Sequence, residues 1–417
     1  MTQSVGNSGG RLTPILKSRA LMAPHLIRKS NHSWNSSVQR SSKTARRKQL
    51  APGPNAAVAV TSAARSPWGR GFWYPLWDVL VIGGGLSLLV GGLLYVSPQS
   101  LRTGIDGHLL WPALLLVNAA HFAASYIRVY TKPKAMERLP ILSFFGPAAL
   151  FLVTVICVSY ASILGRHLTT LYLTWSPYHY AAQTFGLCLI YFYRSGWSVS
   201  MQERQLLKLG AFTPFIWAFI DGRRAGAGLG WFVPTALLDQ YPNVDQSLTF
   251  AQWPFAVISF LAPIALLVFQ WRKQHKLTPL IVPMLLLSNA IWWIFFPYIQ
   301  AFLWATVFHG LQYLGILLAF HIHEQVRPSG TLKHKIFSGA KFYAAAAVMG
   351  YALFRLWGYS FQAAGFGYAE SSVIVLATLN IYHFIVDAYV WRLRGDSNET
   401  VVRYQSVAGR SNAASVG

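Results

Sequence analysis

Charged side chains are scarce in this chain of 417 residues: Asp, Glu, Lys and Arg make up 11% of it, whereas soluble domains carry about 25%. Hydrophobic residues make up 54%, and the mean hydropathy is +0.37. Two cysteines, Cys157 and Cys188, are too few for a disulfide framework, and no CxxC pair exists for a zinc ribbon. This composition excludes a soluble globular enzyme and a disulfide-stapled module.

The short motifs of several enzyme classes are also missing. The sequence contains no GxxxxGK[ST], GxGxxG or HExxH, so nucleotide hydrolysis and zincin chemistry have no support. The HxxxxH clusters that are typical of membrane desaturases are absent as well. Any chemistry must therefore come from residues that the fold brings together.

Acidic residues are absent before Asp78, whereas the same segment holds twelve Lys or Arg. We predict a disordered basic tail over 1–72, a transmembrane helical domain over 73–395 and a flexible tail over 396–417. Other interpretations of the first segment are an over-extended start, an organelle transit peptide, or a tail that lies on anionic lipid. Nucleic-acid binding is disfavoured, because few aromatic residues accompany the charges.

Long apolar runs recur through the rest of the chain. Nine runs are close to the roughly 20 residues that a helix needs to cross a bilayer, and they are continuous rather than alternating, which disfavours a β-barrel. A tenth candidate, 206–238, consists of two short apolar pieces around the charged segment 221–224. We therefore predict an all-α, polytopic helical membrane bundle of about ten transmembrane helices. The nine runs cover 76–96, 107–127, 140–164, 172–193, 249–271, 278–298, 300–322, 339–358 and 368–391.

Basic clusters predict the orientation of these helices. Six clusters fall on one side of the membrane only if 206–238 crosses once, and by the positive-inside rule that side is cytoplasmic. Both termini are then cytoplasmic, and a bacterial inner membrane is favoured over an organelle membrane. The alternative for 206–238 is an interfacial helix plus a short span. Aromatic belts are expected near span ends, where Tyr172, Trp175, Trp292, Trp293 and Trp304 lie.

Four of the twelve histidines lie inside predicted spans: His121, His179, His309 and His383. The predicted topology runs all four of their helices from outside to inside. Ionisable residues within a membrane are costly, so they are functional candidates by default. The remaining histidines lie in the tail, in or near loops, or at a helix end.

Each of these histidines has a polar residue three positions before it and another four positions after it. On a helix these offsets share a face, so each span has one polar stripe that must face the bundle interior. The residues that we expect to orient the histidines or the substrate are Asn118, Ser125, Gln183, Gln312, Tyr313, Asn380 and Asp387.

Four matched stripes predict one shared metal site with the four histidines as ligands. Neutral imidazoles suit iron, copper or zinc, and a ligating imidazole usually donates its other N–H to an oxygen acceptor. We expect a transition metal, and iron in particular. Two alternatives remain open: ordinary polar contacts between helices, or two stacked bis-His haems if the histidines lie at two depths.

Spaced intramembrane histidines are a known way of holding iron. Their use here resembles the strategy of the bacterial carotenoid-cleaving membrane dioxygenases, which hold one iron by histidines. The resemblance lies in the strategy and in no motif, so it assigns no role to any residue.

These observations predict a membrane oxidoreductase or oxygenase whose His-ligated metal acts on a lipid-soluble substrate such as a polyene, quinone or fatty chain. Its expected partners are that substrate and membrane lipids, without nucleic acid. A second hypothesis is electron transfer through bis-His haem. A third is a transporter or assembly factor whose polar stripes line a pathway. Transporters often contain inverted repeats, whereas the stripes here lie on parallel helices.

The single crossing of 206–238 can be tested with reporter fusions placed after Lys208 and after Gln246. We expect opposite orientations, because one crossing separates the two sites. The same orientation at both sites would contradict the ten-span topology.

Overall fold

Helices account for every regular element in the part of the chain that the structure, a computed structural model, describes. These residues are 67–131, 140–275, 278–326 and 330–390, and all of them lie in the unit Ser62–Gly417. Most of the predicted tail 1–72 and all of the tail 396–417 fall outside the described residues.

The first half of the chain contains short helices joined through π-helical turns, followed by two longer helices. In chain order they are α1 Pro75–Trp77, η2 Asp78–Ile82, α2 Gly85–Val96, α3 Gln99–Ile105, η3 Asp106–Leu110, α4 Trp111–Ala113, η4 Leu114–Ala119, α5 Ala120–Thr131, η5 Ile141–Phe145, α7 Gly146–Ser159, η6 Ala161–Gly165, α8 Arg166–Arg194 and α9 Met201–Asp221.

The second half is dominated by long helices. After the 3₁₀ turns η7 Gly222–Ala225 and η8 Gly228–Trp231 come α10 Thr235–Gln240, α11 Pro242–Gln274, α12 Ile281–Phe295, α13 Tyr298–Gln325, α14 Leu332–Tyr351, η9 Ala352–Leu356, α15 Trp357–Ala363 and α16 Tyr368–Val390.

Six of the described helical stretches are long and apolar enough to cross a membrane, which fits an integral membrane protein. They are Gln99–Thr131, Ile141–Ser159, Pro242–Lys273, Tyr298–Gln325, Leu332–Ala363 and Tyr368–Ala388. The pair Pro75–Ile82 and Gly85–Val96, bent by 52°, is a seventh if it counts as one span. Each of the ten predicted ranges contains a helix, but the number of spans and their orientation stay predictions.

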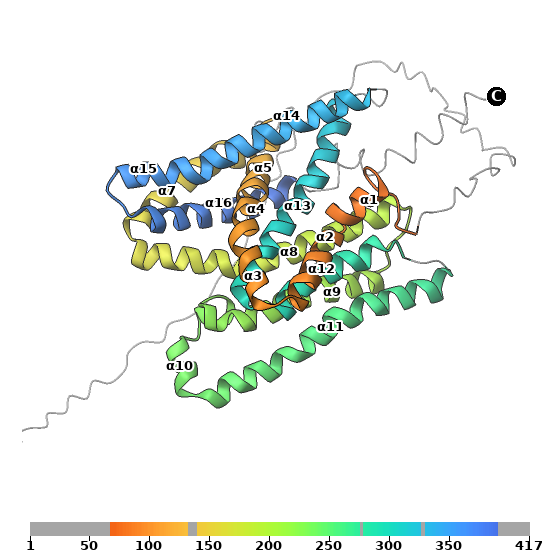
Figure 1. The fold of residues 1–417 in the computed structure, drawn as a ribbon, viewed down its shortest axis with the longest axis horizontal. Coiled ribbons are helices and arrows are strands. Elements are labelled where there is room, and N and C mark those ends of the chain that lie inside the picture. The colour runs from red at the N-terminus through yellow and green to blue at the C-terminus, as the bar shows by residue number, and fades with distance from the viewer. Residues whose placement is uncertain (1–66, 132–139, 276–277, 327–329, 391–417) are drawn as a thin grey trace, which may run out of the picture. The chain divides into compact units, whose positions relative to one another are not determined.

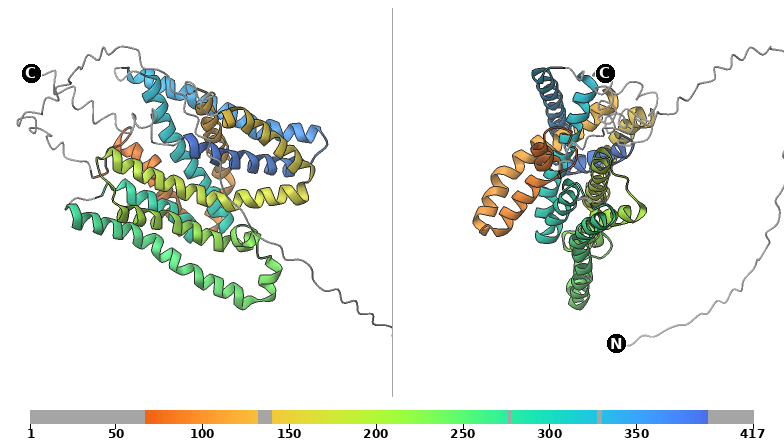
Figure 2. Two further views of the ribbon diagram at one scale, coloured as in Figure 1. Left: turned by 180° about the vertical axis from the view of Figure 1, so that it is seen from behind. Right: turned by 90° about the vertical axis from the view of Figure 1, so that its right-hand side faces the viewer.

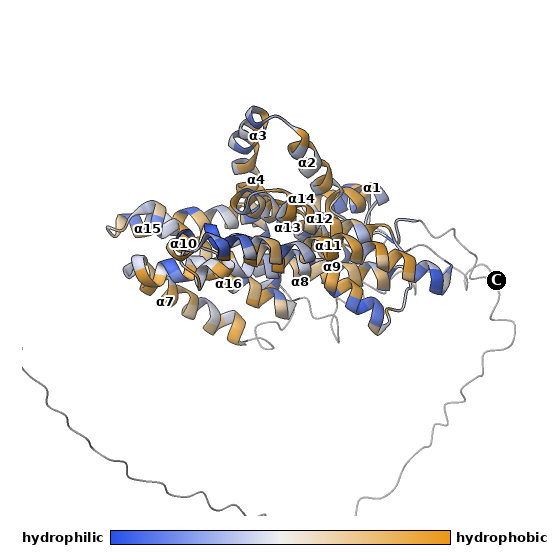
Figure 3. Ribbon diagram, turned by 90° about the horizontal axis from the view of Figure 1, so that it is seen from below, coloured by the Kyte–Doolittle hydropathy of each residue, from blue (hydrophilic) through white to orange (hydrophobic). Residues whose placement is uncertain are grey.

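The long helices lie in two directions. In Figure 1, α8, α9, α11, α14 and α16 run roughly along the horizontal, and α5 and α13 cross them steeply. Figure 2 shows the same crossing from behind, and α8 and α9 pack against each other as do α9 and α11. Hydrophobic residues dominate the middle of the long helices, while the hydrophilic colour gathers near several helix ends (Figure 3). That distribution is the one expected of helices in a bilayer.

The packed part of the chain begins earlier than the predicted boundary at residue 73. Phe72 is buried against the rings of Tyr191 and Phe320. The carbonyl of Pro67 accepts a hydrogen bond from the Leu280 backbone. The backbone N–H of Phe72 donates to the buried carboxylate of Asp78 at 2.6 Å. Residues 67–72 therefore belong to the helical unit rather than to the predicted tail.

The range 206–238 is one helix followed by a folded turn. A capping box formed by Ser200 and Glu203 starts α9, and the helix continues to Asp221. Beyond it, Gly228 takes a positive φ of 55°, and a Cβ there would lie 2.2 Å from the Phe219 carbonyl oxygen. Arg223 is buried and donates to Asp245 of α11 at 2.6 Å. The charged segment 221–224 is thus a turn that an ion pair fastens to α11.

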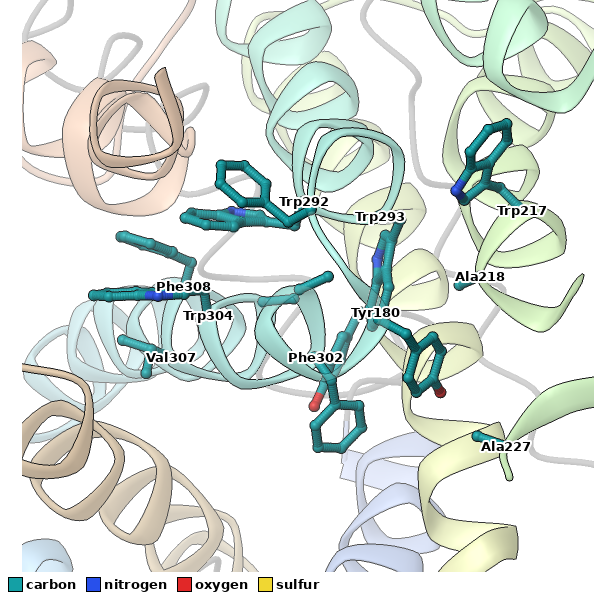
Figure 4. Close-up of a cluster of buried hydrophobic side chains, with 14 of the residues drawn as sticks. Tyr180, Trp217, Ala218, Ala227, Trp292, Trp293, Phe302, Trp304, Val307 and Phe308 are labelled. Carbon is teal, nitrogen blue, oxygen red and sulfur yellow. The ribbon is translucent and has the colours of Figure 1, made fainter. Parts of the chain in front are cut away.

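Most of the aromatic residues near span ends form a core instead of an interfacial belt. Trp292, Trp293 and Trp304 are 1%, 2% and 4% exposed, and Tyr172 is 4% exposed. Trp292 stacks on Trp304 at an interplanar angle of 13° (Figure 4). The belt prediction is wrong for these residues, because α12 and α13 pack their aromatic faces against each other. This core holds α13, which carries His309, in place.

Close helix contact also fixes the helix that carries His121. Gly350 of α14 lies so near the backbone of η4 that a Cβ there would be 2.3 Å from the Ala119 carbonyl oxygen. Small residues let helices in membranes approach in this way. Ala123, Ala124 and Ala346 continue the contact in the same buried cluster.

Replacing Gly350 by Ala should lower the free energy of unfolding by about 1–3 kcal/mol, because the added methyl meets backbone that cannot rotate away. Gly92→Ala in α2 is the matched control, since a Cβ there meets nothing within 4 Å. Denaturant titration of both variants in mixed micelles measures the difference. Equal stability of the two variants would contradict the close approach of α14.

Candidate metal centre

The four intramembrane histidines meet in one cluster. They project from α5, α8, α13 and α16, and they are 1%, 9%, 4% and 0% exposed in the order His121, His179, His309, His383. Neighbouring ring centroids are 5.3 Å apart for 121–309, 4.9 Å for 309–179, 5.3 Å for 179–383 and 4.8 Å for 383–121. The four separations close a circuit in which each imidazole contacts two others.

These separations match those of imidazoles around a single ion. A ring nitrogen binds a metal at about 2 Å, which puts the ring centroid about 3.2 Å from the ion, so the centroids of neighbouring ligand rings lie about 4.5 Å apart at a right angle and about 5.2 Å apart at the tetrahedral angle. Two overlapping groups, His121–His309–His383 and His179–His383–Asp387, each offer ligand atoms that all lie within 4.8 Å of one another. These buried groups could therefore hold a metal ion.

A proline inside α8 lies two residues before His179. Pro177, two residues earlier, removes one backbone N–H and so leaves a carbonyl without its helical partner. That carbonyl, of Leu173, accepts a hydrogen bond from the hydroxyl of Tyr298 at 2.9 Å. The helix therefore continues through the proline, and α8 is tied to the start of α13.

Several ring nitrogens have no hydrogen bond within the described residues. This applies to both nitrogens of His121 and of His309, and to Nε2 of His179 and of His383. Buried polar atoms are nearly always paired, because an unpaired one costs about 1–3 kcal/mol. Each neutral imidazole offers one nitrogen lone pair, and four such rings close together in an apolar bundle form an arrangement that a bound cation would stabilise.

The polar residues four positions after the histidines form a hydrogen-bonded chain. The Ser125 hydroxyl lies 3.0 Å from His383 Nδ1 and 2.6 Å from the Tyr313 hydroxyl. The Tyr313 hydroxyl donates to Asp387 Oδ1 at 2.8 Å. When Asp387 is ionised it only accepts, and the hydrogen-bonded chain then runs in one direction: His383 Nδ1–H donates to Ser125, Ser125 to Tyr313, and Tyr313 to Asp387.

An ionised Asp387 favours the tautomer of His383 that is protonated at Nδ1. With Nδ1 protonated, the lone pair lies on Nε2, as a metal ligand requires. Asp387 Oδ2 lies 3.3 Å from that nitrogen and 3.7 Å from His179 Nε2. A carboxylate oxygen and a nitrogen lone pair repel at such a distance unless a proton or cation lies between them.

Gln183, which follows His179 by four positions, bonds to the backbone of a neighbouring histidine helix rather than to a ring. Gln183 of α8 donates from its side-chain amide to the carbonyl of His309 at 3.2 Å. It thereby ties two of the histidine helices together. All four residues that follow a histidine by four positions thus take part in or brace the cluster, as their position on the same helical face predicts.

The residues three positions before the histidines behave differently. Ser176, Thr306 and Asn380 donate to the carbonyl four residues earlier in their own helices. Asn118 lies in η4, where the wider π-helical winding alters the face that the side chain takes, and its Oδ1 has no partner among the described residues. None of the four side chains has a described hydrogen bond to a histidine ring.

Gln312 lies on a second, polar side of the centre. It lines a cavity of about 20 Å³ next to His309, together with Ser87, Thr184 and Ser288. A cavity of this size and polarity suits one water molecule. The predicted role of Gln312 as an orienting neighbour of the ring therefore changes to that of a wall of this cavity.

Three aromatic rings pack against the histidines, and none of them is among the predicted site residues. The ring of Tyr180 lies 4.4 Å from that of His309, and Phe384 stacks on His179 at 4.3 Å. Phe122 closes a third side against His383 at 4.7 Å. Each of these rings directly follows a histidine in the sequence, and that regularity is the signal which could have identified them.

Gly310 is the exception to that regularity, and the packing explains it. A Cβ at Gly310 would lie 3.1 Å from His121 Nδ1 and 3.2 Å from Val117. Any larger residue after His309 would therefore press on the neighbouring imidazole. A glycine at this point lets α13 approach α5 closely enough to complete the circuit.

An apolar cleft of about 400 Å³ opens beside the centre between α8, α13 and α16. His179, Tyr313 and Asp387 form part of its wall. The centre thus has a small polar cavity next to His309 and a larger apolar cleft next to His179.

No family model, curated protein or solved structure matches this chain. What the site can do must therefore be argued from its own residues. Three or four imidazoles with one carboxylate select a transition metal over calcium or magnesium, which prefer oxygen ligands.

Asp387→Asn should weaken metal binding about 10–100-fold, the usual effect of losing a group that orients a ligand histidine. The change keeps the size of the side chain but removes its charge and the acceptor near His179 and His383. Titration with Zn²⁺ against a competing chelator measures the affinity.

The control for this titration is Glu370→Gln, which neutralises an exposed carboxylate of the same helix. We expect the wild-type affinity for it. Equal affinities for Asp387→Asn and Glu370→Gln would remove Asp387 from the centre.

Proposed function

We propose that this protein is an integral membrane metal-dependent oxidoreductase or oxygenase that acts on a lipid-soluble substrate. The metal is a transition metal, iron by our proposal, and its ligands are His121, His179, His309 and His383. One observation carries the proposal: four buried imidazoles face each other with unpaired nitrogens, and the Asp387 carboxylate lies beside two of them.

An apolar cleft next to the centre supports redox chemistry over hydrolysis. Its lining is dominated by apolar side chains such as Leu187, Ile190 and Ile316, and a lipid-soluble molecule can enter it from the bilayer. A metal with an open coordination position in a water-poor cavity suits reactions with dioxygen or electron transfer to a bound organic molecule.

One group of four rings supports a single metal rather than stacked haems. Two bis-His haems would need two histidine pairs about 15 Å or more apart. Neighbouring rings are at most 5.3 Å apart here. The same convergence argues against polar stripes that line a transport pathway, because the four histidines gather at one level.

The membrane arrangement belongs to the same proposal. We propose ten spans with both termini in the cytoplasm, in a bacterial inner membrane rather than an organelle membrane. Six basic clusters on one side support this orientation. The partners are membrane lipids and the substrate, and the basic segment before residue 67 would face the same side as the inner helix ends.

Elemental analysis and a visible spectrum of the purified protein test the metal. We expect about one transition-metal ion per chain, no haem absorption band, and a loss of most of the metal when any one of the four histidines is replaced by Ala. His334→Ala, an exposed residue at the start of α14, is the control and should retain the metal. A haem band, or unchanged metal content in His309→Ala, would refute the proposed site.

Dioxygen uptake by the iron-loaded protein in vesicles tests the reaction. Two probes, arachidonic acid and a long-chain quinol, distinguish a polyene substrate from a quinone-type substrate. We expect uptake with one of them and none in His309→Ala. No uptake above that variant with either probe would overturn the oxidoreductase assignment.

A further inference from the structure

One face of α8 forms the floor of the apolar cleft over most of the length of the cleft. The α8 residues in the lining recur every three or four positions from Trp175 to Ile190, which is a straight stripe along a helix. At 1.5 Å per residue the stripe is about 22 Å long. The cleft is therefore an elongated furrow rather than a round pocket.

Small residues create this furrow. Ala182 and Gly186 lie in the middle of the stripe, and a Cβ built at Gly186 would meet nothing within 4 Å. A glycine inside a helix costs about 1 kcal/mol relative to alanine. Packing against a neighbouring helix does not require Gly186, unlike Gly350, so the space above it is left for something outside the helices.

The furrow has a polar end and an apolar end. His179, Gln183 and Asp387 lie at one end, and Trp175 meets Phe384 there with ring centroids 6.0 Å apart. Toward the other end the lining is Leu187, Ile190 and Ile316. From His179 the stripe continues about 16 Å in the apolar direction but only about 6 Å to Trp175.

The rim and floor of the furrow differ in exposure. Tyr178 is 44% exposed at the rim, whereas Leu187, Ile190 and Ile316 on the floor are 4%, 5% and 2% exposed. The exposed Tyr178 therefore lies where the furrow opens at the side of the bundle, and the buried Leu187, Ile190 and Ile316 form its inner wall.

We propose that this furrow binds a single extended hydrocarbon chain, with one end of the chain at His179 and Asp387 and the rest lying over Gly186 toward Ile190. The substrate is then a long-chain lipid whose reacting group is at or near the end of its chain. Gly186 determines specificity, because any larger side chain would occupy the path of the chain. The statement about the reacting end depends on the proposed metal function, whereas chain binding stands on the furrow alone.

The test uses two photoactivatable long-chain fatty alcohols in vesicles of dioleoylphosphatidylcholine. One carries a diazirine next to the hydroxyl, and the other carries it near the far end of the chain. We expect the first probe to label the segment around His179 and the second to label 186–190, as mapped by mass spectrometry. An excess of the unlabelled alcohol should compete with both.

Gly186→Leu should reduce labelling by the far-end probe about tenfold, the change that a loss of about 1.4 kcal/mol gives. Gly92→Leu is the matched control, because Gly92 also lies in an apolar helix with nothing within 4 Å of a Cβ. It should label as the wild type does. Metal content, measured in parallel, should be unchanged in both variants.

Metal content and labelling separate failure of this inference from failure of the proposed function. Labelling of 186–190 in a wild-type protein that contains no transition metal would support chain binding while the metal function falls. Labelling that unlabelled alcohol does not displace, or that is equal in Gly186→Leu and wild type, would show only lipid at the surface and would overturn the proposal. Labelling of 186–190 by the probe with the diazirine next to the hydroxyl would reverse the chain and overturn the assignment of the reacting end.

Discussion

The structure depends on one constraint, which is that four imidazoles and a carboxylate lie in an interior that offers them almost no other polar partners. Burial of an unpaired polar group is unfavourable, and burial of an unpaired charge is more so. Hydrogen bonds from neighbouring side chains offset part of this unfavourable free energy. Ser125 and Tyr313 satisfy His383 Nδ1 and Asp387 Oδ1. Each of the four rings has at least one nitrogen without a described hydrogen bond, so one cation would accept a lone pair from each ring.

The packing around the centre follows from the need to bring four helices to one point. α5 and α13 cross the other long helices steeply (Figure 1), so their histidines meet those of α8 and α16 at one place only. Gly310 and Gly350 allow α13 and α14 to approach their neighbours closely, and the stacked tryptophans of α12 and α13 fix the position of α13 (Figure 4). A crossing site of this kind is set by backbone contact, which makes it intolerant of small changes in helix position.

Periodicity made much of this predictable. Apolar runs near 20 residues indicate helices in a membrane, and a helix occupies each of those ranges. The offset of four positions places Ser125, Tyr313 and Asp387 on the faces that meet at the cluster, where Ser125 and Tyr313 bond residues of other helices rather than the rings of the histidines that precede them. Asn118, three positions before His121, does not share the face of the histidine as expected, because a π-helical turn is not visible in the apolar pattern. Asn380, three positions before His383, bonds the backbone of its own helix instead of a histidine ring.

Other features could not be read from one sequence because they depend on how helices cross. Trp292 and Trp293 lie near the ends of their runs, so hydropathy places them at an interface, yet α13 covers them. The furrow along α8 requires both a glycine without a packing partner and a neighbouring helix at the right distance. Gly186 and Gly350 look alike in the sequence, but only Gly350 lies against backbone.

Charge explains why one acid accompanies the four histidines. A divalent ion held by neutral imidazoles alone would keep its full charge inside an apolar bundle, which is strongly unfavourable. Asp387, the acid in the described groups that could hold the ion, would halve that charge through Oδ2 while Oδ1 anchors the hydrogen-bonded chain. A bound metal and an ionised Asp387 would therefore stabilise each other. The cleft lies on the side where this pair is placed, so a bound lipid would meet the most polarising part of the centre and otherwise only apolar walls.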